Sequence, residues 1–539
     1  MAYYKDLREF VAFLESKDKL YRIRREINKD TELHPLVRWQ FRGLKEEQRR
    51  AFIFENVVDI KGKKYSIPVL VACHAPSREV YAMGLQCEVG EIYERWVQGE
   101  RHPIASRLVN EGPVHEEVHI GKGLLEHGGL SEFPVPISTP GFDNAPYLTA
   151  ANWVTKDPET GARNVGNYRA MVKSPTRLGI MVMAPQHMRT HWEKYRKLGK
   201  PMEAAVVLGP PPNIGYVATG KVPYGADEID VAGGMVGEAV ETVKCKTVDL
   251  EVPATTEIVL EGIVPTDSLE REAPFGEFSG YMGMHETAPY FEITAITHRR
   301  NPMFTAFLSQ FPPSESSNLR GIAFEGVFYK FLKYDCNITG ILEVVFHPAA
   351  GAQPLVIIKM KKTYNTEAWQ ALNAAVALVP QFGKIIITVD EDIDARDLES
   401  VMWAVSFRMQ PHRDTRITMG KVSGLDPSSA PMTVTDRRYL YPTGDSAILI
   451  DATMKWDYPP VSLPRKDFME RAKEIWELEE LPTLTPKVPW HGYPLGFWTD
   501  QNREEAEIAL QGDHYLTGEK LAKEERVKLE PPSEGSQAA

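Results

Sequence analysis

The middle of the chain, from about residue 118 to residue 298, is a series of short apolar or alternating runs separated by Gly, Pro and Asp. Pro134, Pro136 and Pro140 mark its start. Many short strands punctuated by turn residues predict an antiparallel barrel or sandwich. One helix, over 229–240, is expected to interrupt it. The expected strands are 148–155, 170–172, 178–182, 204–208, 247–252, 257–262 and 290–298.

The regions on either side of this stretch alternate between helix and strand. Leu7, Phe10, Val11 and Leu14 have helical spacing, which predicts an amphipathic helix over 6–17. Strands at 51–55 and 66–72 and a helix at 91–98 complete an N-terminal α/β unit. A second α/β unit is expected after residue 321. Its elements are helices at 324–333, 366–379 and 395–408 and strands at 341–346, 355–360 and 384–389.

The chain of 539 residues is long enough for about three domains. We therefore predict a mixed α+β (α/β) architecture. An N-terminal α/β domain spans 1–117, a central β-barrel domain 118–320 and a C-terminal α/β domain 321–456. Residues 457–539 form an arm with an acidic amphipathic helix at 466–478, which suits packing between subunits, and a frayed tail from about Lys520.

Composition and charge exclude several classes of protein. A net charge of −12 argues against a protein built to hold nucleic acid or an anionic membrane. No apolar run approaches the roughly 20 residues needed to span a bilayer, and the polar N-terminus does not resemble a signal peptide. The cysteines are too few for a disulfide framework and lack paired metal spacing, so we expect a cytoplasmic location. They are Cys73, Cys87, Cys245 and Cys336.

The stretch from Glu272 to Tyr281 places two carboxylates, Glu272 and Glu277, five residues apart. Pro274 and Gly276 favour a tight turn over regular structure, and a turn can bring both carboxyl groups to one point. Two close carboxylates do not both ionise freely, so we expect one of them to keep its proton near neutral pH and to act as an acid. Taken alone, this stretch is better explained by a surface turn with two solvated acids, because such turns are common.

Three further stretches carry side chains suited to a binding site. Asn164 and Arg169 follow a hairpin turn. An arginine at this position either binds a carboxylate or lies in solvent at the edge of a strand. His187 is either a metal ligand or a histidine with a structural role. Asp227 is expected to cap a helix, and the role of Glu228 stays open. An amide, an imidazole and a carboxylate together would suit Mn²⁺ or Mg²⁺ better than structural zinc.

Several longer motifs, in their order and spacing, resemble the UbiD-type decarboxylases, which use prenylated FMN. The resemblance runs from Asp6 to about Trp456. The motifs are Phe52-Ile-Phe-Glu-Asn, Asn164-x-x-x-Tyr-Arg169, Val243-Lys-Cys, Val252-Pro-Ala-x-x-Glu-Ile-Val-Leu-Glu-Gly262, Pro274-Phe-Gly-Glu-Phe-Ser-Gly-Tyr281, Asp392-Ile-Asp-Ala-Arg-Asp and Trp403-Ala-Val-Ser-Phe-Arg-Met.

The resemblance implies a fold and a set of roles. The central domain would be a split barrel that holds the flavin, and the C-terminal domain would serve oligomerisation. Divalent-metal ligands, usually for Mn²⁺ with K⁺ beside it, would be Asn164, His187 and Glu228. The catalytic network would be Arg169, Glu272 and Glu277, with Glu277 as proton donor and the other two orienting it and the cofactor. Thr149 and Gln186 would line the flavin. Some relatives place a lysine near the cofactor phosphate where this chain has Ser446 or Ala447.

The implied activity is the reversible, non-oxidative decarboxylation of an aromatic or α,β-unsaturated acid, including large or CoA-linked acids. The partners implied are that acid and CO₂, a flavin prenyltransferase that supplies the cofactor, and further copies of the chain in a dimer or hexamer. The pocket wall is expected to include 308–317 and part of 431–442, where Arg437 and Arg438 suit an anionic substrate.

Two other functions remain as alternatives. In the first, the chain is a flavin-binding subunit of a multi-subunit carboxylase and has little activity alone. In the second, it is a hydrolase that uses a pair of carboxylates, such as a glycosidase. The hydrolase ranks last because it gives no role to Asn164, His187 and Glu228.

Overall fold

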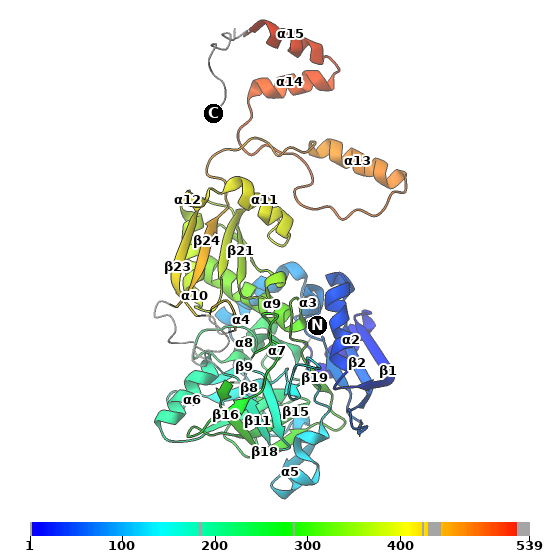
Figure 1. Cartoon of the computed structure of the whole chain (residues 1–539), viewed down its shortest axis with the longest axis vertical. Coiled ribbons are helices and arrows are strands. Elements are labelled where there is room, and N and C mark those ends of the chain that lie inside the picture. Colours follow the sequence, from blue (N-terminus) through cyan, green and yellow to red (C-terminus); the bar gives the residue numbers. More distant parts are fainter. Residues whose placement is uncertain (1–2, 183–185, 284–285, 423–424, 430–443, 525–539) are drawn as a thin grey trace, which may run out of the picture. The chain divides into compact units, whose positions relative to one another are not determined.

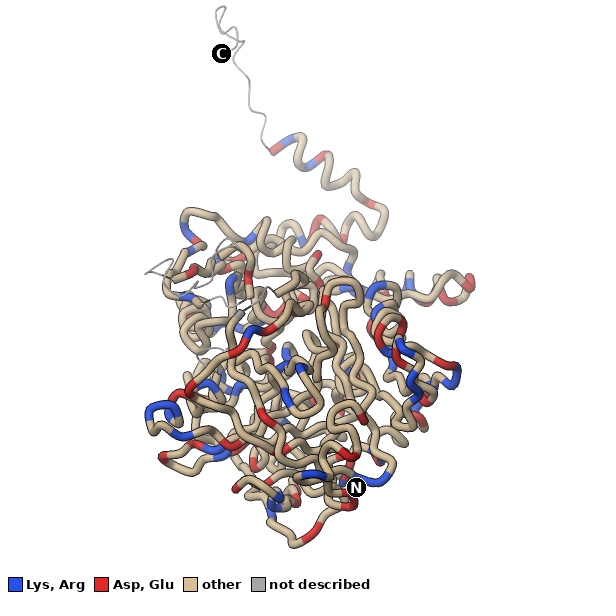
Figure 2. The backbone as a smooth tube through the Cα atoms, turned by 60° about the horizontal axis from the view of Figure 1, so that its bottom comes forward, with Lys and Arg blue, Asp and Glu red and all other residues tan. Residues whose placement is uncertain are grey.

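The computed structural model describes residues 3–182, 186–283, 286–422, 425–429 and 444–524 (Figure 1). Contacts between residues group the chain into two units. The first comprises Met1–Glu391 with Met409–Ala452, and the second comprises Asp392–Arg408 with Thr453–Ala539. Within the described residues, none of the helices has both the length and the apolar composition to cross a bilayer. Lys and Arg are interspersed with Asp and Glu along the tube in Figure 2.

The first unit begins with a five-stranded sheet of order β1-β2-β4-β19, with β3 paired to β2. Its strands are β1 (Leu20–Asn28), β2 (Ala51–Val58), β3 (Lys64–Tyr65), β4 (Val69–Val71) and β19 (Phe304–Ala306). β1 pairs parallel to β2, and β19 pairs parallel to β4. The last strand therefore returns from a point more than two hundred residues further along the chain. The helices of this region are α1 (Leu7–Ser16), α2 (Leu33–Gly43), α3 (Arg78–Gly84) and α4 (Ile92–Arg101).

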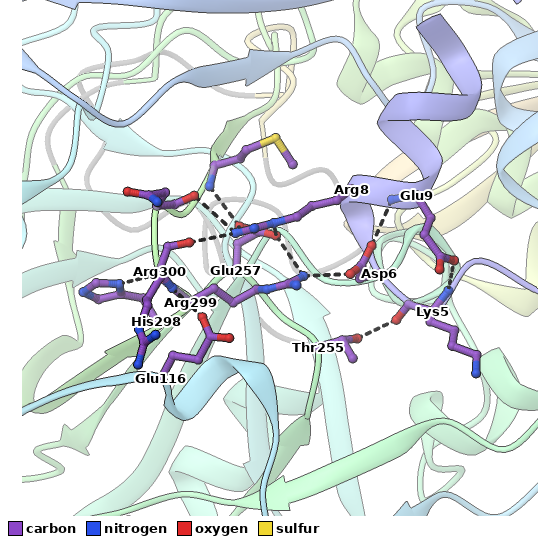
Figure 3. Close-up of polar contacts among 12 residues, drawn as sticks. Lys5, Asp6, Arg8, Glu9, Glu116, Thr255, Glu257, His298, Arg299 and Arg300 are labelled. Carbon is purple, nitrogen blue, oxygen red and sulfur yellow. Dashed lines mark hydrogen bonds and ion pairs between the residues drawn. The ribbon is translucent and has the colours of Figure 1, made fainter. Parts of the chain in front are cut away.

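Helix α1 confirms the amphipathic helix predicted from the sequence. Asp6 caps it by accepting a hydrogen bond from the Glu9 N–H, and Leu7, Phe10, Val11 and Leu14 are buried. Figure 3 shows how its polar side is held. The Arg8 Nε and Nη2 each lie 2.8 Å from an oxygen of the fully buried Glu257. Arg299 Nη1 bridges Asp6 (2.8 Å) and Glu257 (3.3 Å).

The centre of the unit is a nine-stranded, curled half-barrel sheet of order β7-β10-β11-β18-β15-β12-β8-β9, with β6 paired to β18. Its strands are β6 (Glu117–Ile120), β7 (Tyr147–Leu148), β8 (Asn152–Lys156), β9 (Arg163–Asn167), β10 (Ala170–Ser174), β11 (Arg177–Ile180), β12 (Met202–Leu208), β15 (Ile258–Val264) and β18 (Tyr290–His298). Smaller pairings join β5 (Arg107–Leu108), β13 (Glu241–Lys244) and β14 (Glu251–Pro253), and join β16 (Glu270–Glu272) to β17 (Glu286–Ala288). The predicted barrel-like antiparallel architecture is confirmed.

The expectation of one helix in this region is wrong. In addition to α8 (Glu228–Val236), the structure has α5 (Lys122–Glu126), α6 (His187–Lys197) and α7 (Pro212–Val217). Helix α6 is strongly basic and buries only Met188, His191 and Trp192, so its apolar periodicity is too sparse to predict a helix. Helix α8 ends at Val236, before the expected residue 240, because Gly237 adopts φ = 76°.

The C-terminal part of the first unit is a five-stranded sheet of order β20-β21-β22-β24-β23. Its strands are β20 (Ile341–Phe346), β21 (Leu355–Met360), β22 (Ile385–Asp390), β23 (Thr415–Lys421) and β24 (Asp445–Asp451), and its helices are α9 (Glu315–Lys330), α10 (Glu367–Leu378) and α12 (Pro411–Asp414). Helix α9 starts nine residues before the predicted position 324. Ser314 caps it by accepting a hydrogen bond from the Ser317 N–H.

The second unit contains α11 (Leu398–Arg408), α13 (Lys466–Leu478), α14 (Asp500–Leu510) and α15 (His514–Glu524). The predicted helix at 466–478 is confirmed. Arg408 donates to both oxygens of Asp392, and the Tyr493 hydroxyl donates to Asp392 Oδ2 at 3.0 Å. Helices α13, α14 and α15 bury none of their side chains.

Candidate functional site

Arg169 brings the two carboxylates of the Glu272–Tyr281 stretch together. It follows β9, and its Nε and Nη2 donate to Glu272 Oε1 and Oε2 at 3.1 and 2.9 Å. Its Nη1 contacts Glu277 Oε1. The carboxyl groups therefore converge as the sequence predicted. They meet through a guanidinium group, which offsets the repulsion between bare carboxylates that we expected to keep one of them protonated.

A tight hairpin holds Glu277 in place. The Glu277 N–H donates to the Tyr281 carbonyl at 3.0 Å, and the Gly283 N–H donates to the Phe275 carbonyl at 2.8 Å. Gly276 leaves no room for a side chain, because an added Cβ would lie 2.5 Å from Thr139 Oγ1. The predicted turn is thus present, and it fixes the carboxylate of Glu277 beside Arg169.

Asp143 links this hairpin to the backbone at Thr139 through two hydrogen bonds. Its Oδ1 accepts a hydrogen bond from the Gly276 N–H at 3.1 Å, and its Oδ2 accepts one from the Thr139 N–H at 2.6 Å. Burial raises the pKa of Asp143 to about 6, although these hydrogen bonds act in the opposite direction.

Glu228 lies against the backbone of β9 next to Asn164, and His187 lies close to Glu228. Glu228 begins α8, next to the predicted cap Asp227, whose Oδ1 accepts a hydrogen bond from the Ile229 N–H. Glu228 Oε2 accepts from the N–H of Val165, the neighbour of Asn164, at 2.8 Å. Its Oε1 lies 3.8 Å from Nδ1 of His187, the first residue of α6.

These three residues fit a divalent ion. The 3.8 Å gap between His187 and Glu228 is too long for a hydrogen bond, and it is a spacing that two ligands of one ion can adopt. Burial raises the pKa of Glu228, and the nearby His187 opposes this. An amide, an imidazole and a carboxylate suit Mn²⁺ or Mg²⁺.

A cavity of about 690 Å³ adjoins Arg169 and Glu277, and its volume lies in the range of cofactor and substrate sites. Thr149, Arg169, Gln186 and Glu277 line it, whereas Asn164, His187, Glu228 and Glu272 lie outside its lining. Part of the predicted wall, Ser309, Phe311, Pro312 and Ser316, also lines the cavity. The other part, 431–442 with Arg437 and Arg438, lies outside the described residues.

Two basic residues of this cavity were missed from the sequence. Arg320 of α9 faces it, and burial together with Arg169 lowers the pKa of Arg320 to about 10. Lys421 ends β23 and pairs in register with Asp445, beside Ser446, which also lines the cavity. The Lys421 ammonium donates to the Val376 and Val379 carbonyls at 3.0 Å each, and burial lowers its pKa to about 8. A helical arginine and a strand-end lysine carry no local motif that would identify them.

Two family models match the chain. Residues 107–311 match the 3-octaprenyl-4-hydroxybenzoate carboxy-lyase Rift-related domain, and residues 320–452 match the C-terminal domain of the same carboxy-lyase. An uncharacterized protein of Archaeoglobus fulgidus is 32% identical over 507 residues, which are 88% of this chain and 98% of that protein.

Solved structures resemble the chain over most of its length. The UbiD-class enzyme HmfF from Pelotomaculum thermopropionicum, in complex with prFMN, is 31% identical, with a TM-score of 0.74 over 87% of this chain and 100% of that one. Vanillic acid decarboxylase (ShVdcCD) from Sedimentibacter hydroxybenzoicus, in closed form, is 28% identical, with a TM-score of 0.77 over 89% of this chain and 100% of that one.

Proposed function

Because the chain belongs to the UbiD family of carboxy-lyases, we propose that it catalyses the reversible, non-oxidative decarboxylation of an aromatic or α,β-unsaturated carboxylic acid. The observation that carries this proposal is the placement of Arg169 between Glu272 and Glu277, with Arg169 and Glu277 at the cavity wall. HmfF and vanillic acid decarboxylase support the reaction class.

Each member of this group has a role that its geometry suits. Glu277, held by the hairpin at the cavity wall, delivers a proton to the carbon that has lost CO₂. Glu272 is 1% exposed and does not line the cavity, so it orients Arg169 rather than meeting substrate. Arg169 in turn fixes the Glu277 carboxylate, which keeps the proton donor aligned with a bound acid.

The cavity suits prenylated FMN, which supplies the electron sink that decarboxylation at an sp² carbon needs. Asn164, His187 and Glu228 would hold Mn²⁺ or another divalent ion, with K⁺ beside it, next to the cofactor phosphate. Thr149 and Gln186 would line the flavin. Lys421 would take the place of the lysine that this chain lacks at Ser446 and Ala447, since it lies one strand away from them.

Arg320 is the best-placed group to receive the substrate's carboxylate. Arg169 is already paired with Glu272 and Glu277. Among the described residues, the groups that shift the pKa of Arg320 are Arg169 and Tyr168, and neither is a carboxylate. Phe275, Phe278 and Phe311 also line the cavity and offer apolar surface to an aromatic ring. We therefore favour an aromatic acid.

The decisive experiment is anaerobic purification after co-expression with a flavin prenyltransferase, followed by a panel of aromatic, cinnamate-type and CoA-linked acids. Glu277→Gln should retain the flavin and lose both turnover and proton exchange. Glu270→Gln is the matched control, because Glu270 lies on β16, shortly before Glu277 in the chain, and pairs with Lys173 and Arg177. An active Glu277→Gln enzyme would rule out Glu277 as the proton donor.

A flavin-binding subunit that needs a partner is the second candidate. The vanillic acid decarboxylase also exists in an open form with truncated ShVdcD, a second named component of that enzyme. Bound prenylated FMN without turnover on the panel, together with a co-purifying protein, would favour this alternative.

We also propose that the chain forms a homo-oligomer, a dimer or a hexamer, through α13 to α15, whose side chains are all at least partly exposed. We propose in addition that domain boundaries lie at residues 117, 320 and 456, and that the C-terminal parts of the chain mediate oligomerisation. The four cysteines are free thiols, which supports a reducing, cytoplasmic location.

A further inference from the structure

Three histidines and a glutamate meet at one edge of the central sheet. His119 lies on β6 and His298 at the end of β18. These strands are antiparallel, with His119 opposite Ile296, so His298, two residues further on, points to the same face. His127 follows α5, and Glu132 ends a short 3₁₀ turn over Gly129–Glu132.

The ligand atoms of this cluster face one another without hydrogen bonds between them. His119 Nδ1 lies 3.7 Å from Glu132 Oε2, and His298 Nε2 lies 3.8 Å from Glu132 Oε1. Ligand atoms of His119, His127 and Glu132 all lie within 4.8 Å of one another. The rings of His119 and His127 are 3.9 Å apart between centroids, and those of His119 and His298 are 5.0 Å apart.

Two of these side chains are more than nine-tenths buried and have unpaired atoms directed into the cluster. His119 is 4% exposed and His298 is 5% exposed. His119 Nδ1, His298 Nε2 and Glu132 Oε2 are buried and have no hydrogen-bond partner among the described residues. Leaving three such atoms unpaired is costly, so a ligand that satisfies all of them is expected.

The tautomer of His298 is set by a hydrogen bond on its other nitrogen. Its Nδ1 lies 2.8 Å from the carbonyl oxygen of Arg299 (Figure 3). A carbonyl only accepts, so Nδ1 carries the proton and Nε2 presents a lone pair. An imidazole held by a backbone carbonyl is a common arrangement for a metal-binding histidine.

We propose that His119, His127 and Glu132 bind a zinc ion, with His298 as the fourth ligand. Three imidazoles and one carboxylate form a tetrahedral donor set that Zn²⁺ accepts. Burial, together with His127 and His298, lowers the pKa of His119, which keeps it neutral as coordination requires. Burial raises the pKa of Glu132, and a cation would offset that cost.

The zinc would have a structural role, because four protein ligands leave no open position for substrate. It would secure residues 117–132 to the sheet. Leu124 and Leu130 already pack into the core of the unit, and the Leu130 N–H donates to the Pro175 carbonyl. The ion would add a link that joins β6 and β18 directly to the loop after α5. His127 is exposed and Glu132 is half-buried, so an ion can enter from solvent. The site shares no residue with the proposed site at Asn164, His187 and Glu228.

The test uses the full chain, free of flavin and treated with a chelator, and Zn²⁺ alone as the probe. Glu228→Gln serves as the background, so that the other proposed metal site does not contribute. In this background we expect one Zn²⁺ per chain by competition with a chromophoric chelator, and a higher thermal midpoint with Zn²⁺. Co²⁺ should give the visible absorption of a tetrahedral ion.

Adding His127→Gln should weaken Zn²⁺ binding by more than the roughly 10- to 100-fold that losing an outer-sphere partner costs. His127 is exposed, so this variant should still fold. Glu132→Gln should act in the same direction. Glu126→Gln removes the same charge as Glu132→Gln, from an exposed position at the end of α5, and should change nothing. Unchanged Zn²⁺ affinity in the His127→Gln variant would overturn the proposal, as would Zn²⁺ binding without any rise in thermal midpoint.

Discussion

Arg169 and Glu272 are joined by two parallel hydrogen bonds, Nε to Oε1 at 3.1 Å and Nη2 to Oε2 at 2.9 Å, and Glu272 is 1% exposed. This fork-like pairing fixes the plane of the guanidinium group. The remaining nitrogen, Nη1, then contacts Glu277 at the cavity wall. The position of Glu277, the proposed proton donor, thus depends on Arg169 and Glu272. Of these two residues, only Arg169 lines the cavity.

Arg169→Lys should lower kcat by at least about a hundredfold, because an ammonium group cannot make the two parallel bonds that align Glu277. Flavin content should change little. The measurement is single-turnover decarboxylation at saturating substrate. Arg177→Lys is the matched control, since Arg177 pairs with Glu270 and Glu292 and does not line the cavity. Equal rates for the two variants would contradict the positioning role.

Lys421→Met should reduce flavin retention, because it removes the ammonium group expected near the cofactor phosphate. Burial lowers the pKa of Lys421 to about 8, so wild-type affinity for flavin should fall as the pH rises through about 8. The variant should lack that step. The check is flavin binding followed by fluorescence between about pH 7 and pH 9. Lys384→Met is the control, as Lys384 lines the same cavity but is paired with Asp426 at 2.6 Å.

Asp143→Asn should change how stability depends on pH. Burial raises the folded-state pKa of Asp143 from 3.8 to about 6, so the native state binds this proton more tightly than the unfolded chain. Its contribution is complete below about pH 4 and is lost as the pH rises through about 6.

In urea unfolding, the difference in free energy between wild type and Asp143→Asn should fall by about 1–2 kcal/mol across this interval, allowing for partial exposure. Parallel pH profiles for the two proteins would refute the assignment.

Glu257→Gln should destabilise the chain by about 3 kcal/mol, because the fully buried carboxylate accepts hydrogen bonds from Arg8, Arg299 and the Met303 N–H. Helix α1 should loosen first, so limited proteolysis should cut near the N-terminus. Glu116→Gln is the control: Glu116 is exposed and accepts one hydrogen bond from the Arg300 N–H. Equal protease resistance of the two variants would show that this network does not anchor α1.

Replacing Phe468, Ile475 and Leu478 together by Ser should reduce the oligomer to a smaller species while leaving the cavity intact. These residues of α13 are 44%, 46% and 75% exposed, which is unusual for three large apolar side chains on one helix. Light scattering coupled to size-exclusion chromatography is the measurement. Lys473→Ser on the same helix should have no effect, and an unaltered mass in the triple variant would remove α13 from the interface.

The sequence predicted the regular elements with strong periodicity and the turn that carries the carboxylates. Pro274 and Gly276 predicted the hairpin, and the apolar spacing of 6–17 and 466–478 predicted α1 and α13. Local chemistry decides such features, so a local pattern is enough to find them.

Other features depend on tertiary contacts and escaped prediction. β19 is a three-residue strand whose pairing partner, β4, lies far away in the sequence. Arg320 and Lys421 become cavity residues only when α9 and β23 meet the barrel. The metal-ligand roles of Asn164, His187 and Glu228 are implied by family resemblance and stay a prediction, and the structure adds that His187 lies close to Glu228.

The pairing of β19 with β4 has a consequence for synthesis of the chain. A ribosome releases β1, β2 and β4 long before residues 304–306 leave the exit tunnel, so β4 stays an open edge during that interval. Glu257, which anchors α1, also arrives late. The first hundred residues therefore cannot complete their fold as an independent unit, and their final assembly must wait until the barrel has been translated.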